Sequence, residues 1–207
     1  MNAYDVMKIS PIVPVIALDD EKDALPLAEA LLEGGIRIME ITLRTPAGLK
    51  SIERIARAMP QMHVGAGTVC SPSDLKRALE HGSAFVFSPG ITPELIASAA
   101  ANKIPFIPGV GSASEVMLAQ NSGLLHAKLF PATVVGGTSA LKALGGPFAS
   151  MRFCPTGGVT LANMNDFLAL ENVMCVGGSW IVPKEAIAQG DFKQITLLAR
   201  EALQIIR

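Results

Sequence analysis

Short apolar runs and amphipathic stretches alternate along the whole of this 207-residue chain. Each apolar run, with the helical pattern that follows it, takes roughly 20 to 27 residues, the length of one strand–helix unit. Because each helix has to cross back over the sheet before the next strand begins, the alternation predicts parallel strands. We expect these strands at residues 12–18, 36–41, 63–66, 84–87, 104–107, 125–130, 151–154 and 173–176.

Eight such units without a linker or a break in composition predict a single domain over residues 1–207, folded as a closed (β/α)8 TIM barrel. A doubly wound open sheet is the structural alternative, because periodicity along the chain does not show whether a sheet closes. Residues 1–9 are expected to form an extra N-terminal helix under the barrel, and residues 192–206 a long closing helix. Ser71 and Thr92, each followed by a proline, are expected to cap helices.

The composition narrows the classes of partner and compartment. Only 17% of the residues are charged and the net charge is -1, so neither nucleic acid nor an anionic membrane is expected as a partner. No apolar run has the length of a transmembrane helix, and the first ten residues lack a signal-peptide pattern. The three cysteines and three histidines are scattered, which predicts neither disulfides nor a metal site. We therefore expect a cytoplasmic globular protein.

Lys128 interrupts an apolar run that extends from residue 124 to residue 132. Burying an ammonium group costs several kcal/mol unless the group is paired or neutralised. Burial lowers the pKa of a lysine by as much as about 3 to 5 units, and a neutral amine can attack a ketone to form an imine. The alternative is a lysine at a strand end whose stem is buried and whose ammonium group is in water. Lys128 alone does not decide between these interpretations.

Glu40 ends another expected strand, so the chain has a second charge at a strand end. Strand alternation places Lys128 and Phe130 on one face of their strand, and the inward face of a barrel is shared by all strands. Functional groups of such barrels lie at the carboxyl ends of the strands. We therefore expect the Glu40 carboxylate and the Lys128 amine to meet in one cavity. A purely structural buried ion pair is the alternative.

Two loop residues after other strands are candidate ligand contacts. Arg44 follows Glu40 in the loop above it, where a guanidinium could clamp a carboxylate, although a solvated loop arginine is the simpler interpretation. Thr68 ends the segment Gly65-Ala66-Gly67-Thr68, whose glycines allow the backbone to approach a ligand or simply form a tight turn.

Glycine pairs follow the last two expected strands, at Gly157-Gly158 and at Gly177-Gly178 before Ser179. Many barrels bind a phosphate with the loops after their last two strands, through backbone N–H groups that glycine leaves accessible. The two pairs predict an anion site to which the Ser179 hydroxyl contributes. A third pair, Gly136-Gly137, is expected to be a hinge or a helix cap.

Taken together, these segments resemble the 2-keto-3-deoxy-6-phosphogluconate (KDPG) aldolase family, which includes 4-hydroxy-2-oxoglutarate aldolases. The resemblance extends from about residue 12 to residue 203, with the motifs in the same order and at similar spacing. The motifs are Glu40-Ile41-Thr42-Leu43-Arg44-Thr45, Gly65-Ala66-Gly67-Thr68, Ser88-Pro89-Gly90, Lys128-Leu129-Phe130-Pro131-Ala132, Phe153-Cys154-Pro155-Thr156-Gly157-Gly158 and Gly177-Gly178-Ser179-Trp180.

The resemblance implies a lyase that forms a Schiff base on Lys128 and uses Glu40 as general acid and base. It implies a homotrimer that needs no metal or other cofactor, and it names a phosphorylated keto sugar acid and pyruvate as the small molecules bound. The implied substrate contacts are Arg44 and Thr68 at the pyruvyl carboxylate, Phe130 at the pyruvyl moiety, Thr156 at the aldehyde, Gly157, Gly158, Gly178 and Ser179 at the phosphate, and Pro89.

One position departs from the family pattern, since Thr133 stands where the family often has glutamate. This difference bears on the local polar network and on the range of substrates rather than on the central chemistry. Two other functions remain open. The first is an isomerase or decarboxylase in which Glu40 acts and Lys128 is only its electrostatic partner. The second is a barrel that binds a sugar phosphate without catalysis.

Overall fold

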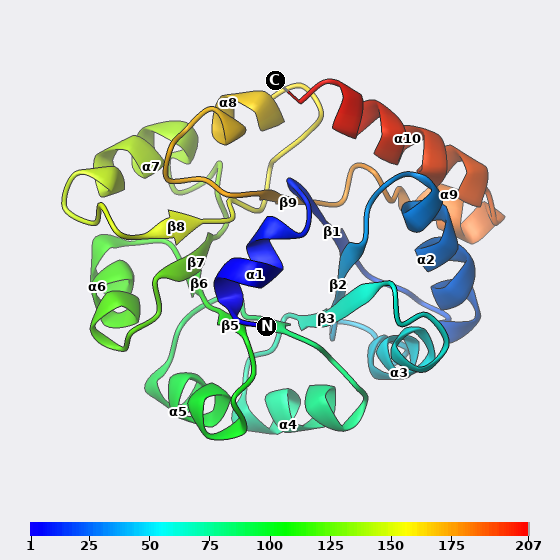
Figure 1. Cartoon of the computed structure of the whole chain (residues 1–207), viewed down its shortest axis with the longest axis horizontal. Helices are drawn as coiled ribbons and strands as arrows, with labels where there is room; N and C mark the ends of the chain where they lie inside the picture. Colours follow the sequence, from blue (N-terminus) through cyan, green and yellow to red (C-terminus); the bar gives the residue numbers. More distant parts are fainter. Residues whose placement is uncertain (207) are drawn as a thin grey trace.

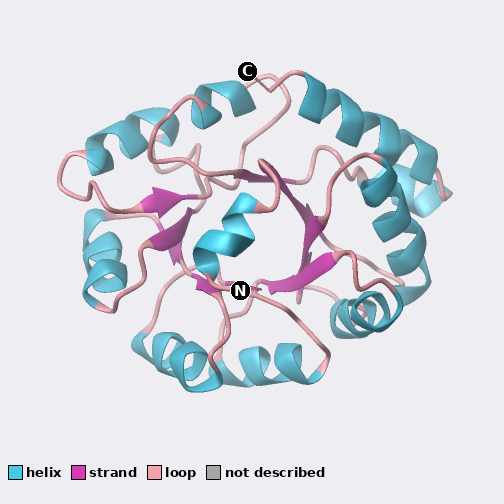
Figure 2. Cartoon of the chain, in the orientation of Figure 1, coloured by secondary structure: helices cyan, strands magenta, loops and turns pink. Residues whose placement is uncertain are grey.

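The computed structural model describes residues 1–206, and Arg207 lies outside the described part of the chain. It is an α/β structure in which strands gather around the centre and helices lie outside them (Figures 1 and 2). The strands of the described residues are β1 (Ile12–Ile16), β2 (Ile38–Thr42), β3 (His63–Gly67), β4 (Val86–Phe87), β5 (Phe106–Ile107), β6 (Gly109–Val110), β7 (His126–Leu129), β8 (Arg152–Phe153) and β9 (Val176–Gly178).

The helices follow the strands in regular order, with an additional helix at the N-terminus. They are α1 (Ala3–Lys8), the 3-10 helix η1 (Glu21–Asp23), α2 (Ala24–Glu33), α3 (Gly48–Ala58), α4 (Pro72–Glu80), α5 (Pro93–Asn102), α6 (Ala113–Asn121), α7 (Gly137–Gly145), α8 (Met164–Leu168), α9 (Lys184–Gln189) and α10 (Phe192–Gln204).

The predicted terminal helices and helix caps are confirmed. Helix α1 lies across the middle of the ring of strands, and α10 lies on the outside next to α2 (Figure 1). Ser71 and Thr92 begin α4 and α5, and their side chains accept hydrogen bonds from the backbone N–H groups of Asp74 and Leu95. Each cap satisfies an N–H group that has no partner within its helix.

The strands form two separate sheets, so the prediction of a single closed eight-stranded TIM barrel is wrong. One sheet has six strands in the order β5-β4-β3-β2-β1-β9, and the other has three in the order β6-β7-β8. All pairings between these strands are parallel, as the alternating pattern predicted. After β8, the bridges seen within residues 1–206 are isolated ones, Phe153 with Val173 and Thr156 with Gly177.

A proline lies at each interruption, Pro108 between β5 and β6 and Pro155 directly before the Thr156 bridge. A proline has no N–H group to donate to a neighbouring strand, so each position lacks one possible hydrogen bond of a ladder. Proline alone does not end a ladder here, because the carbonyl oxygens of Pro108 and Pro155 accept hydrogen bonds from the N–H groups of Lys128 and Gly177, and Pro14 lies within β1. Strand β8 is also only two residues long, which leaves few backbone groups for pairing with β9.

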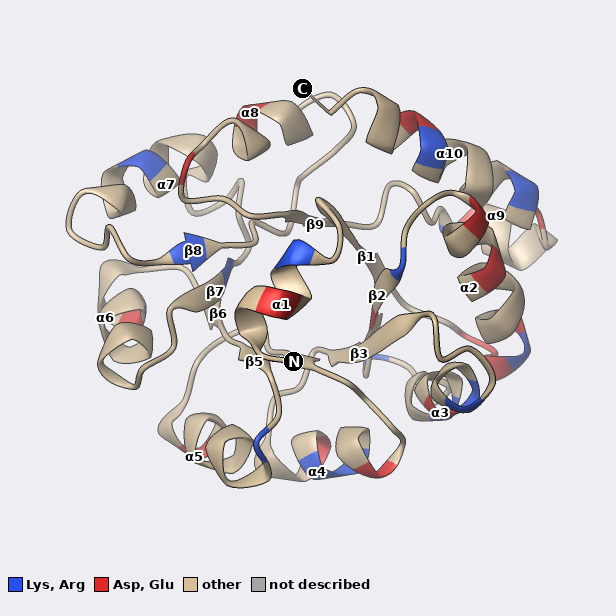
Figure 3. Cartoon of the chain, viewed as in Figure 1, with Lys and Arg blue, Asp and Glu red and all other residues tan. Residues whose placement is uncertain are grey.

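The apolar core fills the space between strands and helices, and the charged residues lie mainly outside it. Figure 3 shows lysine, arginine, aspartate and glutamate on the outer helices. The buried charged residues of the described chain are Glu40 and Lys128. Because burying a charge is costly, these two residues identify the part of the interior with a role beyond packing.

Candidate active site

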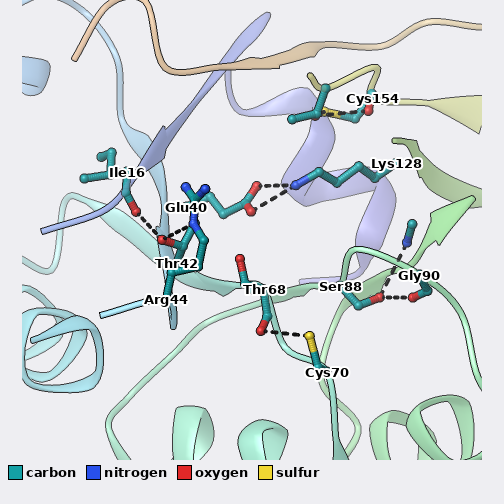
Figure 4. Close-up of polar contacts among 12 residues, drawn as sticks. Ile16, Glu40, Thr42, Arg44, Thr68, Cys70, Ser88, Gly90, Lys128 and Cys154 are labelled. Atoms are coloured by element: carbon teal, nitrogen blue, oxygen red, sulfur yellow. Dashed lines mark hydrogen bonds and ion pairs between the residues drawn. The ribbon is translucent and has the colours of Figure 1, made fainter. Parts of the chain in front are cut away.

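The carboxylate of Glu40 and the amine of Lys128 meet between β2 and β7, as strand alternation predicted (Figure 4). Lys128 Nζ lies 3.0 Å from Glu40 Oε1 and 3.3 Å from Oε2. Glu40 is 1% exposed and Lys128 is 4% exposed, so the lysine does not extend its ammonium group into water. The interpretation of Lys128 as a partly solvated lysine at a strand end is therefore wrong.

Two glycines on β3 make room for neighbouring side chains, Gly67 for Glu40 and Gly65 for Phe85. A Cβ atom at Gly67 would lie 2.6 Å from the Cγ and Cδ atoms of Glu40, and a Cβ atom at Gly65 would overlap the ring of Phe85. Both glycines lie on the face of β3 that points toward the interior, because alternate residues share a face. From the sequence, these glycines were expected either to let the backbone approach a ligand or to form a tight turn. That expectation missed the space they leave for neighbouring side chains.

Seven of the predicted site residues surround one cavity of about 60 Å³. This is room for a small organic acid or a few water molecules. The cavity is lined by Val15, Glu40, Thr42, Arg44, Thr68, Pro89, Lys128, Phe130 and Thr156. The geometry therefore brings an amine, a carboxylate, a guanidinium and hydroxyl groups to one point, although these residues come from six separate segments of the chain.

Arg44 is held above the cavity by Thr42. The Arg44 Nε group donates a hydrogen bond to Thr42 Oγ1 over 3.2 Å, and Thr42 Oγ1 donates to the backbone oxygen of Ile16 over 2.9 Å (Figure 4). Among the described residues Arg44 forms no ion pair with a carboxylate. Its guanidinium is therefore free to bind an anion in the cavity that it lines. Sequence analysis missed Thr42, although alternation along β2 puts it on the face of Glu40.

Thr68 lines the cavity with an unusual backbone conformation. Its φ angle is 58°, in the left-handed region that residues other than glycine rarely adopt. A threonine in this region has a conformational cost of about 1 to 3 kcal/mol. The Cys70 thiol donates a hydrogen bond to the Thr68 carbonyl oxygen over 3.5 Å. The strain lies at the edge of the cavity, where Thr68 provides a side-chain hydroxyl that glycine would lack.

Thr156 also lines the cavity and is buried. Its hydroxyl donates to the Cys154 carbonyl oxygen over 3.4 Å, and a Cβ atom at Gly177 would overlap this hydroxyl. A hydrogen bond with Cys154, together with burial, raises the pKa of the Cys175 thiol well above its ordinary value. A thiol in this state is protonated and a poor nucleophile, so Cys175 does not compete with Lys128.

The predicted phosphate contacts lie outside the small cavity. Ser179 lines an adjoining cavity of about 320 Å³, which shares Val15 and Arg44 with the first. Lys184, at the start of α9, also lines this second cavity. The two cavities therefore adjoin, with the amine of Lys128 on the wall of the first and Ser179 on the wall of the second.

The predicted glycines of the phosphate loops also have structural reasons. Gly157 and Gly158 have φ angles of 96° and 79°, which favour glycine. Thr133 holds this loop, since its backbone N–H and its hydroxyl both donate to the Gly157 carbonyl oxygen, over 3.1 and 3.3 Å. A Cβ atom at Gly178 would overlap the ring of Trp180. The glycines alone therefore do not establish an anion site.

Within residues 1–206, no group of three or more histidine, cysteine, aspartate or glutamate side chains is arranged to hold a metal ion. None of the helices in the same residues has the length and apolar character needed to cross a membrane.

Comparison with known proteins gives a consistent assignment. Residues 4–198 match the family model described as "KDPG and KHG aldolase". The chain is 46% identical to "KHG/KDPG aldolase" of Escherichia coli (strain K12) over 98% of this chain and 95% of that protein. It is 51% identical to "2-dehydro-3-deoxy-phosphogluconate aldolase" of Pseudomonas aeruginosa, over 93% of this chain and 88% of that protein.

A solved structure resembles the fold over nearly its whole length. It is the KDPG aldolase of Legionella pneumophila, with pyruvate captured at low pH as a covalent carbinolamine intermediate. The TM-score is 0.96 and the sequence identity 44%, with 98% of each chain covered. Because the family model spans most of the chain and the relatives match it from end to end, this chain belongs to the KDPG and KHG aldolase family.

Proposed function

We propose that this protein is a class I aldolase that cleaves 2-dehydro-3-deoxy-6-phosphogluconate into pyruvate and glyceraldehyde 3-phosphate. The observation that carries the proposal is the buried pair of Lys128 and Glu40, 3.0 Å apart, at the wall of a cavity that Arg44 also lines. A reactive amine, a proton carrier and a carboxylate-binding cation are the three groups that this chemistry requires.

In the first half of the reaction, Glu40 accepts a proton from Lys128 through the hydrogen bond that joins them. The neutral amine then attacks the C2 ketone, and the carbonyl oxygen leaves as water after protonation. The product is a protonated imine, which carries a positive charge on Nζ. The direct contact between Nζ and Oε1 supports this transfer, because a general base has to lie within hydrogen-bond distance of the proton it moves.

In the second half, Glu40 removes the proton of the C4 hydroxyl, directly or through water. The electron pair of the C3–C4 bond moves into the protonated imine, so an aldehyde leaves and a neutral enamine remains. Glu40 then returns the proton to the enamine carbon, which becomes the methyl group of pyruvate. Water hydrolyses the imine and regenerates Lys128.

The other residues orient the substrate. Arg44 and Thr68 hold the pyruvyl carboxylate, while Phe130 and Pro89 pack against the pyruvyl moiety in the small cavity. Thr156 contacts the reacting aldehyde. Gly157, Gly158, Gly178 and Ser179 bind the phosphate in the direction of the second cavity. Two adjoining cavities support this orientation, because Arg44 lines both and Ser179 lines only the second, which suits a substrate with two anionic groups.

A second substrate is 4-hydroxy-2-oxoglutarate, which would give pyruvate and glyoxylate. It requires the same amine and carboxylate but no phosphate contact. The E. coli relative, 46% identical, has both activities in its name, and this observation favours including the second substrate.

We also propose that residues 1–207 act as one domain, that the protein assembles as a homotrimer and that it works in the cytoplasm. These three proposals rest on the family resemblance and on the absence of a linker in the sequence. Sedimentation equilibrium tests the assembly, and a mass other than three times that of the chain would contradict the trimer.

The activity is tested by incubating the protein with each substrate and measuring both products. We expect pyruvate and glyceraldehyde 3-phosphate in equal amounts from the phosphorylated substrate. An isomerised or decarboxylated product without carbon–carbon cleavage would favour an enzyme in which Lys128 only pairs with Glu40. Ligand-induced stabilisation without any product would favour a binding protein.

A further inference from the structure

We propose that Phe87 is a positioning residue that stabilises the positively charged imine of Lys128 through the face of its ring. This inference rests on the proposed Schiff-base function and adds a residue that does not contact the substrate. Phe87 is the last residue of β4, and its side chain is completely buried.

Two aromatic rings face the amine of Lys128. Nζ lies over the ring of Phe87 at 5.4 Å from its centroid, and over the ring of Phe130 at 5.3 Å. Both distances are within the range of a cation–π contact, in which the electron-rich face of a ring attracts a cation. The Glu40 carboxylate is the third neighbour of Nζ. Within residues 1–206, these are the aromatic rings that make such a contact with Lys128.

Phe130 and Phe87 differ in their access to the substrate. Phe130 lines the small cavity, so its ring has a direct packing surface for a bound molecule. Phe87 is absent from the cavity wall in the described structure and has no exposed surface. Its ring therefore acts on the reaction only through Nζ.

The position of the Phe87 ring is fixed from two sides. It packs edge-to-face against Phe85, with 5.8 Å between the ring centroids and an angle of 85° between the planes. The backbone oxygen of Phe87 accepts a hydrogen bond from the Val69 N–H group over 3.2 Å. A ring held in this way keeps its face toward Nζ while the substrate binds and leaves.

The chemical step that depends on this contact is the loss of water from the carbinolamine. The carbinolamine nitrogen is neutral, whereas the imine that follows is protonated and positively charged. An interaction that favours the cation shifts the balance toward the imine, the species that accepts the electrons of the C3–C4 bond. Water cannot stabilise this charge in a site that is nearly closed to solvent, so ring faces and the Glu40 carboxylate have to do so.

The test replaces Phe87 with phenylalanines that carry one, two and three ring fluorines. Fluorine withdraws electron density from the ring face and changes the volume little, so packing is retained while the attraction for a cation weakens. The wild type and each variant are incubated with pyruvate labelled with carbon-13 at C2. Carbon NMR then measures the ratio of imine to carbinolamine, because the two carbons differ in hybridisation.

We expect this ratio to fall stepwise with each fluorine, by about 2- to 30-fold over the series. The matched control is the same series at Phe153, which is equally buried but is not one of the two rings beside Lys128 Nζ. Its fluorination should leave the ratio within experimental error of the wild type. Phe87→Leu, which removes the ring and keeps an apolar side chain, should lower the ratio at least as far as the trifluorinated variant.

The outcomes separate this inference from the proposed function. If the wild type forms neither adduct with pyruvate, the Schiff-base function itself is wrong. If the wild type forms the imine but the Phe87 series is flat, the function stands and Phe87 is only a packing residue. An equal decline in the Phe153 and Phe87 series would also overturn the inference, because the effect would then come from the core in general.

Discussion

The molecule has a cavity at each end of its strands, and the two differ in size and in chemistry. The cavity at the strand starts, between α1, α5 and α6, measures about 420 Å³, and no acidic side chain among the described residues lines it. The cavity at the Lys128–Glu40 pair measures only about 60 Å³. The larger cavity is the weaker candidate for catalysis, because converging charged groups rather than volume distinguish a reactive site.

Strand β7 contributes a residue to each cavity, and the two residues, His126 and Lys128, differ in their contacts. His126 lines the larger cavity and packs edge-to-face against Tyr4, with 5.8 Å between the ring centroids. Lys128 lies further along the same strand and is paired with Glu40. The start of β7 thus contributes a side chain that packs against α1, and its later part contributes one member of the buried charged pair. In parallel α/β folds the functional groups likewise lie toward the carboxyl ends of the strands.

The largest effect is expected for Lys128→Met. Cleavage should fall below detection, because among the described residues no other amine lines the small cavity. The free energy of unfolding should also decrease, by about 3 to 5 kcal/mol, since the buried Glu40 loses its partner. Urea titration of the single variant and of the Glu40→Gln/Lys128→Met double variant checks the second part.

The double variant should recover most of the lost stability while remaining inactive, because it contains no unpaired buried charge. Full cleavage activity in Lys128→Met would remove this residue from the mechanism. An equally low stability of both variants would show that the loss comes from packing rather than from Glu40.

A smaller effect is expected for Glu40→Gln, which keeps the size of the side chain and its contact with Nζ. Proton transfer by a positioned group contributes about 10²- to 10⁴-fold, so turnover should fall by this order. Slow imine formation with pyruvate should persist. Steady-state kinetics and imine trapping measure the two quantities separately, and near-normal turnover would assign the proton transfers to another group.

Ser179→Ala tests the predicted phosphate contact in the second cavity. Loss of a hydrogen bond to a charged group should raise KM for the phosphorylated substrate about 10- to 100-fold. Exchange of the methyl protons of pyruvate should remain at the wild-type rate, because pyruvate has no phosphate. Ser150→Ala, an exposed serine that pairs with Gln120, is the matched control and should change neither quantity. Equal losses in both reactions would place Ser179 outside a phosphate site.

The smallest effect is expected at the other end of β7. Burial, with a contribution from the charge of Arg152, lowers the pKa of His126 below its ordinary value of 6.5. The native protein therefore binds this proton less tightly than the unfolded chain does. The stabilisation is complete above pH 6.5 and is lost as the pH falls from 6.5 toward the lower folded pKa.

His126→Gln should remove this part of the pH dependence of unfolding and leave cleavage unchanged. Urea titrations of both proteins over this pH range provide the measurement, and His63 is present in both, so its similar contribution cancels. A large loss of activity in His126→Gln would contradict the division of β7 into a packing end and a chemical end.

The alternation of apolar and amphipathic segments was sufficient to predict the order of the elements and their parallel pairing. Each expected strand overlaps an observed one, but β6 was missed because two residues after Pro108 have no periodicity to detect. The closed barrel was a wrong prediction because a local pattern does not report which strands pair, and the pairing that follows β8 is reduced to isolated bridges. The last strand begins at Val176 rather than Val173, which makes only an isolated bridge.

For the site, alternation predicted that Glu40 and Lys128 would meet, and the geometry confirms it. The roles of the individual residues remain predictions. Sequence analysis missed Thr42 and Phe87, because their importance comes from partners on other segments, Arg44 and Lys128. It also treated Gly67 as a ligand or turn residue, since only the structure shows that the Glu40 carboxylate occupies the space of its absent side chain.

The central claim is that the buried amine of Lys128 forms a covalent imine with the substrate. It is tested most directly by reducing the protein with borohydride in the presence of pyruvate and locating the added mass by peptide mapping. The account predicts that one peptide is modified, at Lys128, and that Lys128→Met is not modified under the same conditions. Modification of another lysine, equal modification of the variant, or no modification of the wild type would contradict it.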